Sequence, residues 1–239
     1  MNRLVLVTGG SKGLGFCVAK KHLEMGDRVY ALVRRISDSL NNLMKNYPSL
    51  TVKLCDLGKT EEVEAAMSEL VSSGETLDIL YNVAGIFFED DRVPLEETDL
   101  ERCLQIFNIN TLGCLRVMKY AVPVLKEGTI LINVSSESGS IADCHRSQEY
   151  GYSMSKSALN IASKIFSNQM AEKKIRVFCY HPGWMKTDMG GEGALLSTTS
   201  LTPEEAAEAI TDIALHPDTI PECSAQRLPQ TRRIVPAAW

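Results

Sequence analysis

Several features are missing from this chain of 239 residues, and each absence argues against a class of protein. No apolar run reaches the ~18 residues of a membrane-spanning helix, so we expect no membrane segment. Basic residues are fewer than acidic ones, 25 against 30, which argues against a nucleic-acid-binding surface. The seven cysteines form no CxxC pair or Cys/His cluster, so we expect neither a metal site nor a disulfide framework. The first residues lack the apolar core of a signal peptide, and we expect a cytoplasmic protein with reduced thiols.

Short apolar runs alternate with longer amphipathic stretches along most of the chain. The expected strands are Leu4–Val7, Arg28–Val33, Leu50–Cys55, Leu77–Tyr81, Thr129–Val134 and Ile175–Tyr180. One expected helix follows the first strand and ends near Met25. Three others span Thr60–Val71, Asp99–Leu125 and Gly151–Lys173. This alternation predicts one α/β domain over residues 1–239, with a doubly wound parallel sheet of the Rossmann type between two helical layers. The tail 222–239 fits no pattern. Its Ile234-Val235, preceded by Arg232 and Arg233, is either a seventh strand or part of a loose end.

A glycine-rich turn follows the first strand and reads Thr8-Gly9-Gly10-Ser11-Lys12-Gly13-Leu14-Gly15. Glycines at a strand-to-helix turn let the backbone approach a pyrophosphate, and the helix N-terminus then offers free N–H donors. The alternative is a tight turn without a ligand. We expect this turn to bind a dinucleotide through Gly9, Ser11, Lys12, Gly13, Leu14 and Gly15.

The end of the second strand indicates which nicotinamide cofactor is bound. NAD enzymes tend to place an acid there for the ribose 2′-hydroxyl, whereas an arginine suits a 2′-phosphate. Here Val33 occupies the place of the acid, Arg34 follows it, and Lys12 lies in the glycine turn. Two cations favour NADP(H) over NAD(H). The alternative is that Arg34 and Arg35 are ordinary solvated charges.

Two further strand ends belong to the same expected pocket. Asp56, before Leu57, either accepts from the adenine amino group or starts a turn. Asn82-Val83-Ala84-Gly85 follows the fourth strand, at the edge where open α/β sheets bind ligands. We include Asp56, Leu57, Asn82, Ala84 and Gly85 among the cofactor-binding residues.

The segment Tyr152-Ser153-Met154-Ser155-Lys156 carries the chemistry that we expect. On a helix, Tyr152 and Lys156 lie on one face, and an ammonium near a phenol favours its ionised form and lowers its pKa. Tyr152 then serves as a proton donor or acceptor. Asn133-Val134-Ser135-Ser136 ends the fifth strand, where a hydroxyl can stabilise charge on a substrate oxygen. The alternatives are an exposed Tyr–Lys pair and serines that only cap a turn.

Together these motifs resemble the short-chain dehydrogenase/reductase family over residues 3–190, with His181-Pro182-Gly183 as a further match. The resemblance implies a Rossmann fold, a nicotinamide cofactor and a catalytic tetrad formed by Asn110, Ser136, Tyr152 and Lys156. It gives Asn110 a water-holding role in a proton relay and Lys156 contacts with the nicotinamide ribose. Pro182, Gly183 and Thr187 match cofactor-binding positions, with Thr187 at the carboxamide. The run His181–Gly191 resembles the C-factor-like and sniffer-like carbonyl reductases.

Three places depart from the family pattern. Val83 replaces an asparagine, with little expected effect on catalysis. Tyr152 follows Ser136 by 16 positions, a longer gap than usual, because the polar insertion Asp143–Glu149 lies between them. Ser138 competes with Ser136 for the role of the tetrad serine.

The sequence therefore predicts an NADP(H)-dependent oxidoreductase that transfers a hydride between nicotinamide and a small carbonyl or alcohol substrate. One alternative is a cofactor-binding sensor or signalling protein with little turnover, and another is a lyase or epimerase on the same scaffold. Family resemblance implies a homodimer or homotetramer that assembles through the two long helices. Substrate specificity is expected from residues 87–92, 139–150 and 190–202, the last being either a mobile lid or a plain loop.

Overall fold

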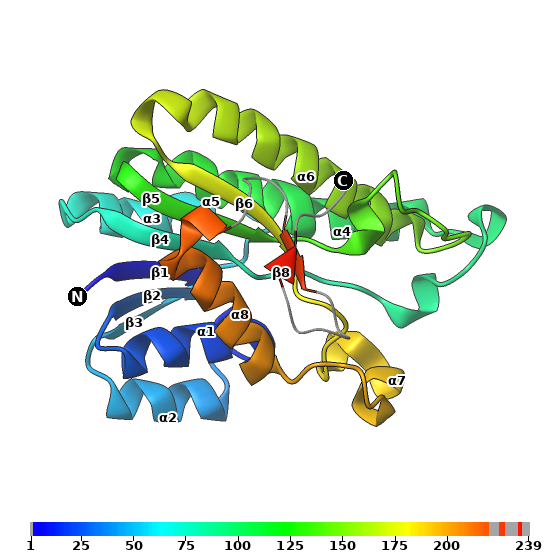
Figure 1. Ribbon diagram of the computed structural model, residues 1–239, viewed down its shortest axis with the longest axis horizontal. Coiled ribbons are helices and arrows are strands. Elements are labelled where there is room, and N and C mark those ends of the chain that lie inside the picture. The colour runs from blue at the N-terminus through cyan, green and yellow to red at the C-terminus, as the bar shows by residue number, and fades with distance from the viewer. Residues whose placement is uncertain (1, 220–224, 228–233, 236–239) are drawn as a thin grey trace.

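A twisted sheet forms the centre of the molecule (Figure 1), as a computed structural model shows for residues 2–219, 225–227 and 234–235. Its strand order is β3-β2-β1-β4-β5-β6-β7-β8, and among these strands β8 alone runs antiparallel to its neighbour. The strands are β1 (Leu4–Thr8), β2 (Arg28–Val33), β3 (Leu50–Leu54), β4 (Leu77–Asn82), β5 (Leu125–Val134), β6 (Arg176–His181), β7 (Ala225–Arg227) and β8 (Ile234–Val235). The predicted α/β fold is confirmed.

Helices cover both faces of the sheet because alternate strand residues point to opposite sides. The helices are α1 (Gly13–Glu24), α2 (Asp38–Asn46), α3 (Thr60–Ser72), α4 (Leu100–Phe107), α5 (Cys114–Ala121), α6 (Tyr150–Met170), α7 (Gly191–Leu196) and α8 (Pro203–Leu215). In β1, Val5 and Val7 pack on the side of α1, α2 and α8, whereas Leu4 and Leu6 pack toward α3, α5 and α6. Figure 1 shows these two helical layers below and above the sheet.

The prediction of one helix over Asp99–Leu125 is wrong in detail. Helix α4 ends at Phe107, a π-helical turn spans Asn108–Gly113, and α5 then continues to Ala121. Strand β5 begins at Leu125 instead of Thr129, and its register with β4 shifts between Leu77 and Ile79. A π turn inserts extra backbone into a helix without changing its apolar face, so the sequence pattern gives no sign of it.

Three helices were not among the predicted elements. Ser37 caps α2 by accepting from Leu40 N, and α8 opens with a capping box between Thr202 and Glu205. Helix α7 occupies part of the segment 190–202, which is therefore not a plain loop. Of the tail, Ile234–Val235 is a strand, whereas Arg232 and Arg233 lie outside the described residues.

The strand order reverses between β1 and β4, since β2 and β3 lie on one side of β1 and β4 to β6 on the other. Open α/β sheets bind their ligands at the carboxyl ends of the strands beside such a reversal. The glycine turn after β1 and the segment Val83–Gly85 after β4 meet at this place: Thr8 Oγ1 accepts from Val83 N at 3.0 Å and Ala84 N at 3.1 Å. No helix in the described part of the chain is long and apolar enough to cross a membrane.

Candidate active site

The glycine turn adopts a conformation that needs its glycines. Gly9 and Gly13 have φ values of +73° and +58°, which L side chains rarely adopt. A methyl group at Gly15 would lie 2.4 Å from the carbonyl oxygen of Gly9, so α1 can approach β1 this closely only without a side chain there. The turn brings the start of α1 to the carboxyl edge of the sheet.

The start of α1 fits an anionic group. Lys12 precedes the helix and supplies no side-chain cap for its first N–H groups. Uncapped N–H groups, together with the helix dipole, suit a pyrophosphate. Thr187 lies beside the turn, because its Cγ2 atom would be 3.7 Å from a Cβ atom added at Gly13. The residues present here therefore fit a dinucleotide, and a nicotinamide cofactor bound there would supply hydride-transfer chemistry.

The two predicted phosphate cations differ in their surroundings. Val33, at the end of β2, is 1% exposed, and Arg34 after it is exposed and makes no ion pair with any residue that the structure describes. Lys12 forms an ion pair with Asp188, whose carboxyl pKa this contact holds below its usual value. Arg34 is thus available to a 2′-phosphate, whereas Lys12 would have to exchange partners.

The remaining cofactor candidates lie along the same edge, some with their side chains engaged elsewhere. Asp56 Oδ1 accepts from Gly58 N at 2.9 Å, which is the turn that we gave as the alternative for this residue. The side chain of Leu57 is buried in the core. Asn82 Nδ2 donates to Asn133 Oδ1 at 2.8 Å inside the sheet. Ala84 packs against Gly9, and Gly183 follows Pro182 with a φ of +89°. Cofactor contacts for these residues stay predictions.

The two serines after β5 have different environments. Ser135 Oγ donates to Asn160 Oδ1 of α6 at 2.6 Å, so this hydroxyl is used in packing. Ser136 Oγ lies 3.1 Å from two alternative acceptors, Glu137 Oε2 and Ser138 Oγ, and accepts from Ser138 N at 3.1 Å. A hydrogen bond between the side chains of Ser136 and Tyr152 is among the interactions that lower the pKa of Tyr152. Ser136 therefore pairs with Tyr152, as predicted, with Ser138 behind it.

Tyr152 and Lys156 lie on one face of α6, as their spacing predicts. Lys156 is 4% exposed; its Nζ donates to Val134 O at 2.9 Å and lies 5.6 Å from the centre of the Tyr152 ring. Burial lowers the pKa of Lys156 and raises the pKa of Tyr152 to about 12. The expectation of a lowered Tyr152 pKa is therefore wrong, because burial of the phenol outweighs the hydrogen bond with Ser136 and the attraction of Arg146.

Asn110 lies in the π turn, and its side chain binds the backbone after β4. Its Oδ1 accepts from Ile86 N at 2.7 Å, and its Nδ2 donates to Ile86 O at 2.9 Å and Ser155 Oγ at 3.2 Å. A Cβ atom at Gly85 would be 3.2 Å from Asn110 Oδ1 and 3.7 Å from Lys156 Nζ, so Gly85 lies between the two side chains. The structure thus brings together all four predicted tetrad residues, and the π turn places Asn110. The predicted water-holding role of Asn110 stays a prediction.

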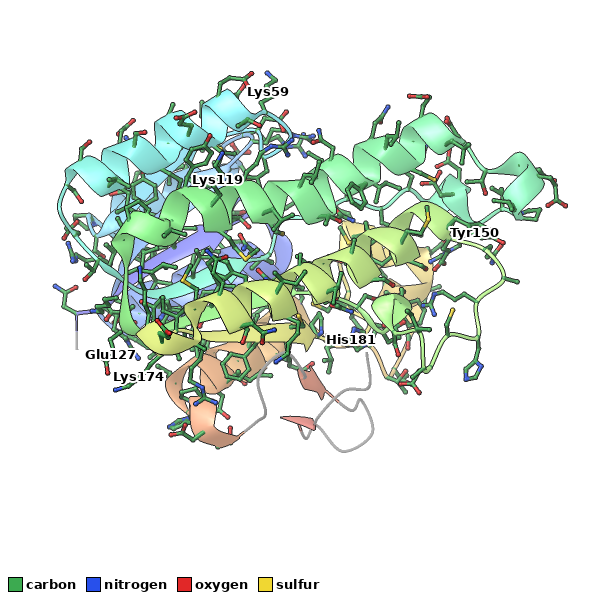
Figure 2. The ribbon with its side chains drawn as sticks, turned by 90° about the horizontal axis from the view of Figure 1, so that it is seen from above. Lys59, Lys119, Glu127, Tyr150, Lys174 and His181 are labelled. Carbon is green, nitrogen blue, oxygen red and sulfur yellow. The ribbon has the colours of Figure 1, made fainter. Side chains whose placement is uncertain are left out.

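A set of charged residues beside Ser136 was not predicted as functional. Glu137 Oε2 lies 3.0 Å from His181 Nε2, at the end of β6, and Glu137 Oε1 accepts from Arg146 at 2.7 Å. Figure 2 shows His181 and Tyr150 lying away from Glu127 and Lys174. Glu127 lies near the start of β5, and Lys174 lies between the end of α6 and the start of β6. The polar insertion Asp143–Glu149 was visible in the sequence as a departure from the family pattern, but no motif linked Arg146 to Glu137.

Comparisons with known proteins identify the family and the fold. The family model described as short chain dehydrogenase matches residues 3–194. A carbonyl reductase family member 4 from Danio rerio is 30% identical, over 88% of this chain and 90% of its own. A structure of a short-chain dehydrogenase/reductase from Burkholderia multivorans with bound NADP superposes with a TM-score of 0.81, at 27% identity over 90% of this chain and 91% of that one. The carbonyl reductase Sniffer of D. melanogaster shares the fold, with a TM-score of 0.84, 24% identity and full coverage of both chains.

The match covers most of the chain and includes every element that carries the glycine turn and the four tetrad residues. The predicted resemblance is confirmed on these grounds: this chain belongs to the short-chain dehydrogenase/reductase family of oxidoreductases, which use a nicotinamide cofactor.

Proposed function

We propose that the protein is an NADP(H)-dependent carbonyl reductase or alcohol dehydrogenase in which Tyr152 transfers the proton. The observation that carries this proposal is the convergence of Ser136, Tyr152 and Lys156 at the carboxyl edge of the sheet, beside the glycine turn. The exposed Arg34 after a buried Val33 supports NADP(H), as does the NADP bound in the related B. multivorans protein.

Each residue of the tetrad has a distinct task. The Tyr152 hydroxyl, with its pKa raised to about 12 by burial, stays protonated at neutral pH, which is the form that donates to a carbonyl oxygen. Ser136 donates a hydrogen bond to the same oxygen and stabilises the negative charge that develops there. Lys156, whose Nζ lies 5.6 Å from the centre of the Tyr152 ring, would hold the ribose of the cofactor, and Asn110 fixes the backbone at Ile86.

Replacement of Tyr152 by phenylalanine tests the proposal. NADPH oxidation would be followed with a panel of aldehydes and ketones, for the wild type, Tyr152→Phe and the control Tyr120→Phe. Tyr120 contacts Glu64 on α3, away from the tetrad. We expect Tyr152→Phe to lose about 10²–10⁴-fold in kcat, the usual share of a general acid, with NADPH affinity retained. NADPH binding without turnover of any carbonyl by the wild type would contradict the proposal and favour a cofactor-binding sensor.

A further inference from the structure

Glu137 places a carboxylate directly beside the reacting centre. Its Oε2 atom lies 3.1 Å from Ser136 Oγ, and its side chain is 43% exposed, so it is both in contact with the tetrad and open to the outside. None of the roles of the tetrad residues uses this carboxylate. Because Glu137 Oε2 is this close to Ser136 Oγ, a substrate whose oxygen accepts from Ser136 can place a group on its neighbouring carbon against Glu137.

The polar insertion holds Glu137 in this place. Arg146 donates to Glu137 Oε1 at 2.7 Å and to Glu149 Oε2 at 3.0 Å. Glu149 has a φ of +66°, which is uncommon for a residue with a side chain and costs about 1 kcal/mol or more. Arg92 donates to the second oxygen of Glu149 at 2.8 Å. These paired contacts fix the carboxylate of Glu137 instead of leaving it to rotate into solvent.

Arg92 also connects the insertion to the phenol ring of Tyr152, through Phe87. The Arg92 guanidinium lies 5.2 Å from the centre of the Phe87 ring, and Phe87 meets the Tyr152 ring edge-on at 5.2 Å. Ser136 and Tyr152 are therefore enclosed by one connected wall that runs from Glu137 through the insertion to Phe87.

This wall carries a net negative charge. Three carboxylates, those of Glu89, Glu137 and Glu149, face two guanidiniums, those of Arg92 and Arg146. His181 adds no charge at neutral pH, because burial lowers its pKa. An anionic group on the carbon next to a substrate carbonyl would lie within a few ångströms of Glu137 and be repelled.

The hydrogen of Ser136 adds a second, independent constraint. A serine hydroxyl has one hydrogen to donate, and in this structure Glu137 Oε2, Ser138 Oγ and the Tyr152 hydroxyl compete for it. During reduction that hydrogen must be donated to the substrate oxygen, which leaves Glu137 Oε2 without one of its donors. A hydroxyl or amino group on the carbon next to the carbonyl can replace it, because two vicinal heteroatoms lie about 3 Å apart. That spacing matches the distance from Ser136 Oγ to Glu137 Oε2, which is 3.1 Å.

We propose that Glu137 is a specificity-determining residue that selects carbonyl compounds with a hydroxyl or amino group on the adjacent carbon and rejects 2-keto acids. This inference rests on the proposed function. The reaction is a reduction in which the carbonyl carbon takes the hydride of NADPH and its oxygen takes the proton of Tyr152, which then regains a proton from water. The product is a vicinal diol or amino alcohol and NADP⁺, and the substituent that contacts Glu137 is not altered.

A matched set of substrates tests the inference. Acetophenone, 2-hydroxyacetophenone and phenylglyoxylate differ only in the group next to the carbonyl, and acetone, hydroxyacetone and pyruvate form a smaller set. We expect the wild type to rank the hydroxyketone first and the keto acid last in kcat/KM. In Glu137→Gln the ratio of hydroxyketone to plain ketone should fall by about tenfold, the difference between a charged and a neutral hydrogen-bond acceptor. The ratio of plain ketone to keto acid should fall by a similar factor.

A ratio of two substrates within one variant cancels any change in the amount of folded enzyme. Comparing the same ratio between variants cancels the intrinsic reactivity of each compound. Glu127→Gln, which breaks an ion pair with Lys174 far from the tetrad (Figure 2), is the matched control and should leave both ratios unchanged. Unchanged ratios in Glu137→Gln, or a wild type that prefers the keto acid, would overturn the inference while leaving the proposed function in place. A wild type that reduces no carbonyl compound would overturn both.

Discussion

At the scale of single residues, Arg34 offers the sharpest test of cofactor preference. It follows the buried Val33, it is exposed, and no acid at the end of β2 competes for a ribose hydroxyl. A guanidinium that binds a 2′-phosphate makes a charge-assisted contact which NADH cannot make. Arg34→Ala should therefore weaken NADPH binding by about tenfold and leave NADH binding nearly unchanged.

Fluorescence titration with both cofactors measures this preference directly. Lys45→Ala, which removes an exposed cation from α2, controls for the general effect of charge on a cofactor with several phosphates. Equal losses of NADPH affinity in the two variants would show that Arg34 acts only through net charge.

Removing the charge of Asp188 should have the opposite effect and tighten NADPH binding. Its carboxylate pairs with Lys12 in the glycine turn, and both side chains are more than half exposed. The ion pair therefore contributes little to the stability of the fold, but it engages the Lys12 ammonium that we expect to face a phosphate. Asp188→Asn should tighten NADPH binding by a few-fold, most clearly at low salt, where exposed charges are least screened. Weaker binding in Asp188→Asn would show that Lys12 needs its acid partner to reach the cofactor.

The sequence predicted the role of a residue where a motif defines that role. It gave no prediction where the role depends only on tertiary contacts. The spacing of Tyr152 and Lys156 and the glycines of the turn were enough to place them. That the Ser135 hydroxyl is used in packing depends on Asn160, which lies on another element and accepts from Ser135. Glu137 had no local signal, because its partners His181 and Arg146 are distant in sequence from each other.

At the scale of elements, periodicity was sufficient for the six long strands and for α1, α3 and α6. It failed at α2, where only Leu40 and Leu43 are buried and the other positions are mostly polar. It failed also at the π turn, where Asn110 binds Ile86 and Thr111 donates to Ser155 O of α6. Contacts of this kind between elements cannot be deduced from the residues of one element.

A buried polar network joins four elements at the end of the sheet away from the tetrad. His22 of α1 and Asp27 before β2 are both fully buried, with His22 Nδ1 2.8 Å from Asp27 Oδ2 and His22 Nε2 3.0 Å from Tyr81 Oη of β4. Arg3, before β1, also binds Asp27. Burial lowers the pKa of His22 below 6.5 despite its acid partner. For Asp27, burial raises the pKa, but hydrogen bonds from Arg3 and His22 outweigh it and the pKa is lowered below 3.8.

This network should make stability fall in acid. Below pH 6.5 the unfolded chain protonates His22 while the folded protein does not, so stability decreases as pH falls from 6.5 toward the folded-state pKa. Asp27 contributes in the same direction at pH values below 3.8, where the unfolded carboxyl is protonated first. Urea unfolding between about pH 5 and pH 7.5 should show a slope of up to ~1.4 kcal/mol per pH unit from His22.

Two variants separate this contribution from the other titrating groups. His22→Gln should be less stable at neutral pH and show a flatter dependence on pH, because the titrating group is gone. His216→Gln removes an exposed histidine and should leave the slope as in the wild type. A slope that persists in His22→Gln would assign the acid sensitivity to other residues.

At the scale of the whole molecule, one layer of helices exposes apolar side chains. Helix α6 exposes Met154, Ile161 and Ile165 at 51%, 60% and 60%, and α4 exposes Leu100 and Leu104 at 64% and 61%. Contiguous exposed apolar side chains on a folded monomer commonly mark an interaction surface. These helices lie in the two segments, 99–125 and 151–173, through which family resemblance predicts assembly, and their exposed residues are suited to burial against a second copy of the chain.

Light scattering of the purified protein should therefore give the mass of a dimer or tetramer. The double variant Ile161→Glu/Ile165→Glu should shift it to a smaller species, because a charge buried in an apolar interface without a partner is strongly unfavourable. Leu54→Glu, on β3 with 64% exposure, adds a comparable charge elsewhere and should leave the mass unchanged. Since the tetrad of each copy is complete within its own chain, separated subunits should still bind NADPH. A wild type that is monomeric at micromolar concentration would refute assembly through α6, and loss of NADPH binding on separation would show that assembly supports the site itself.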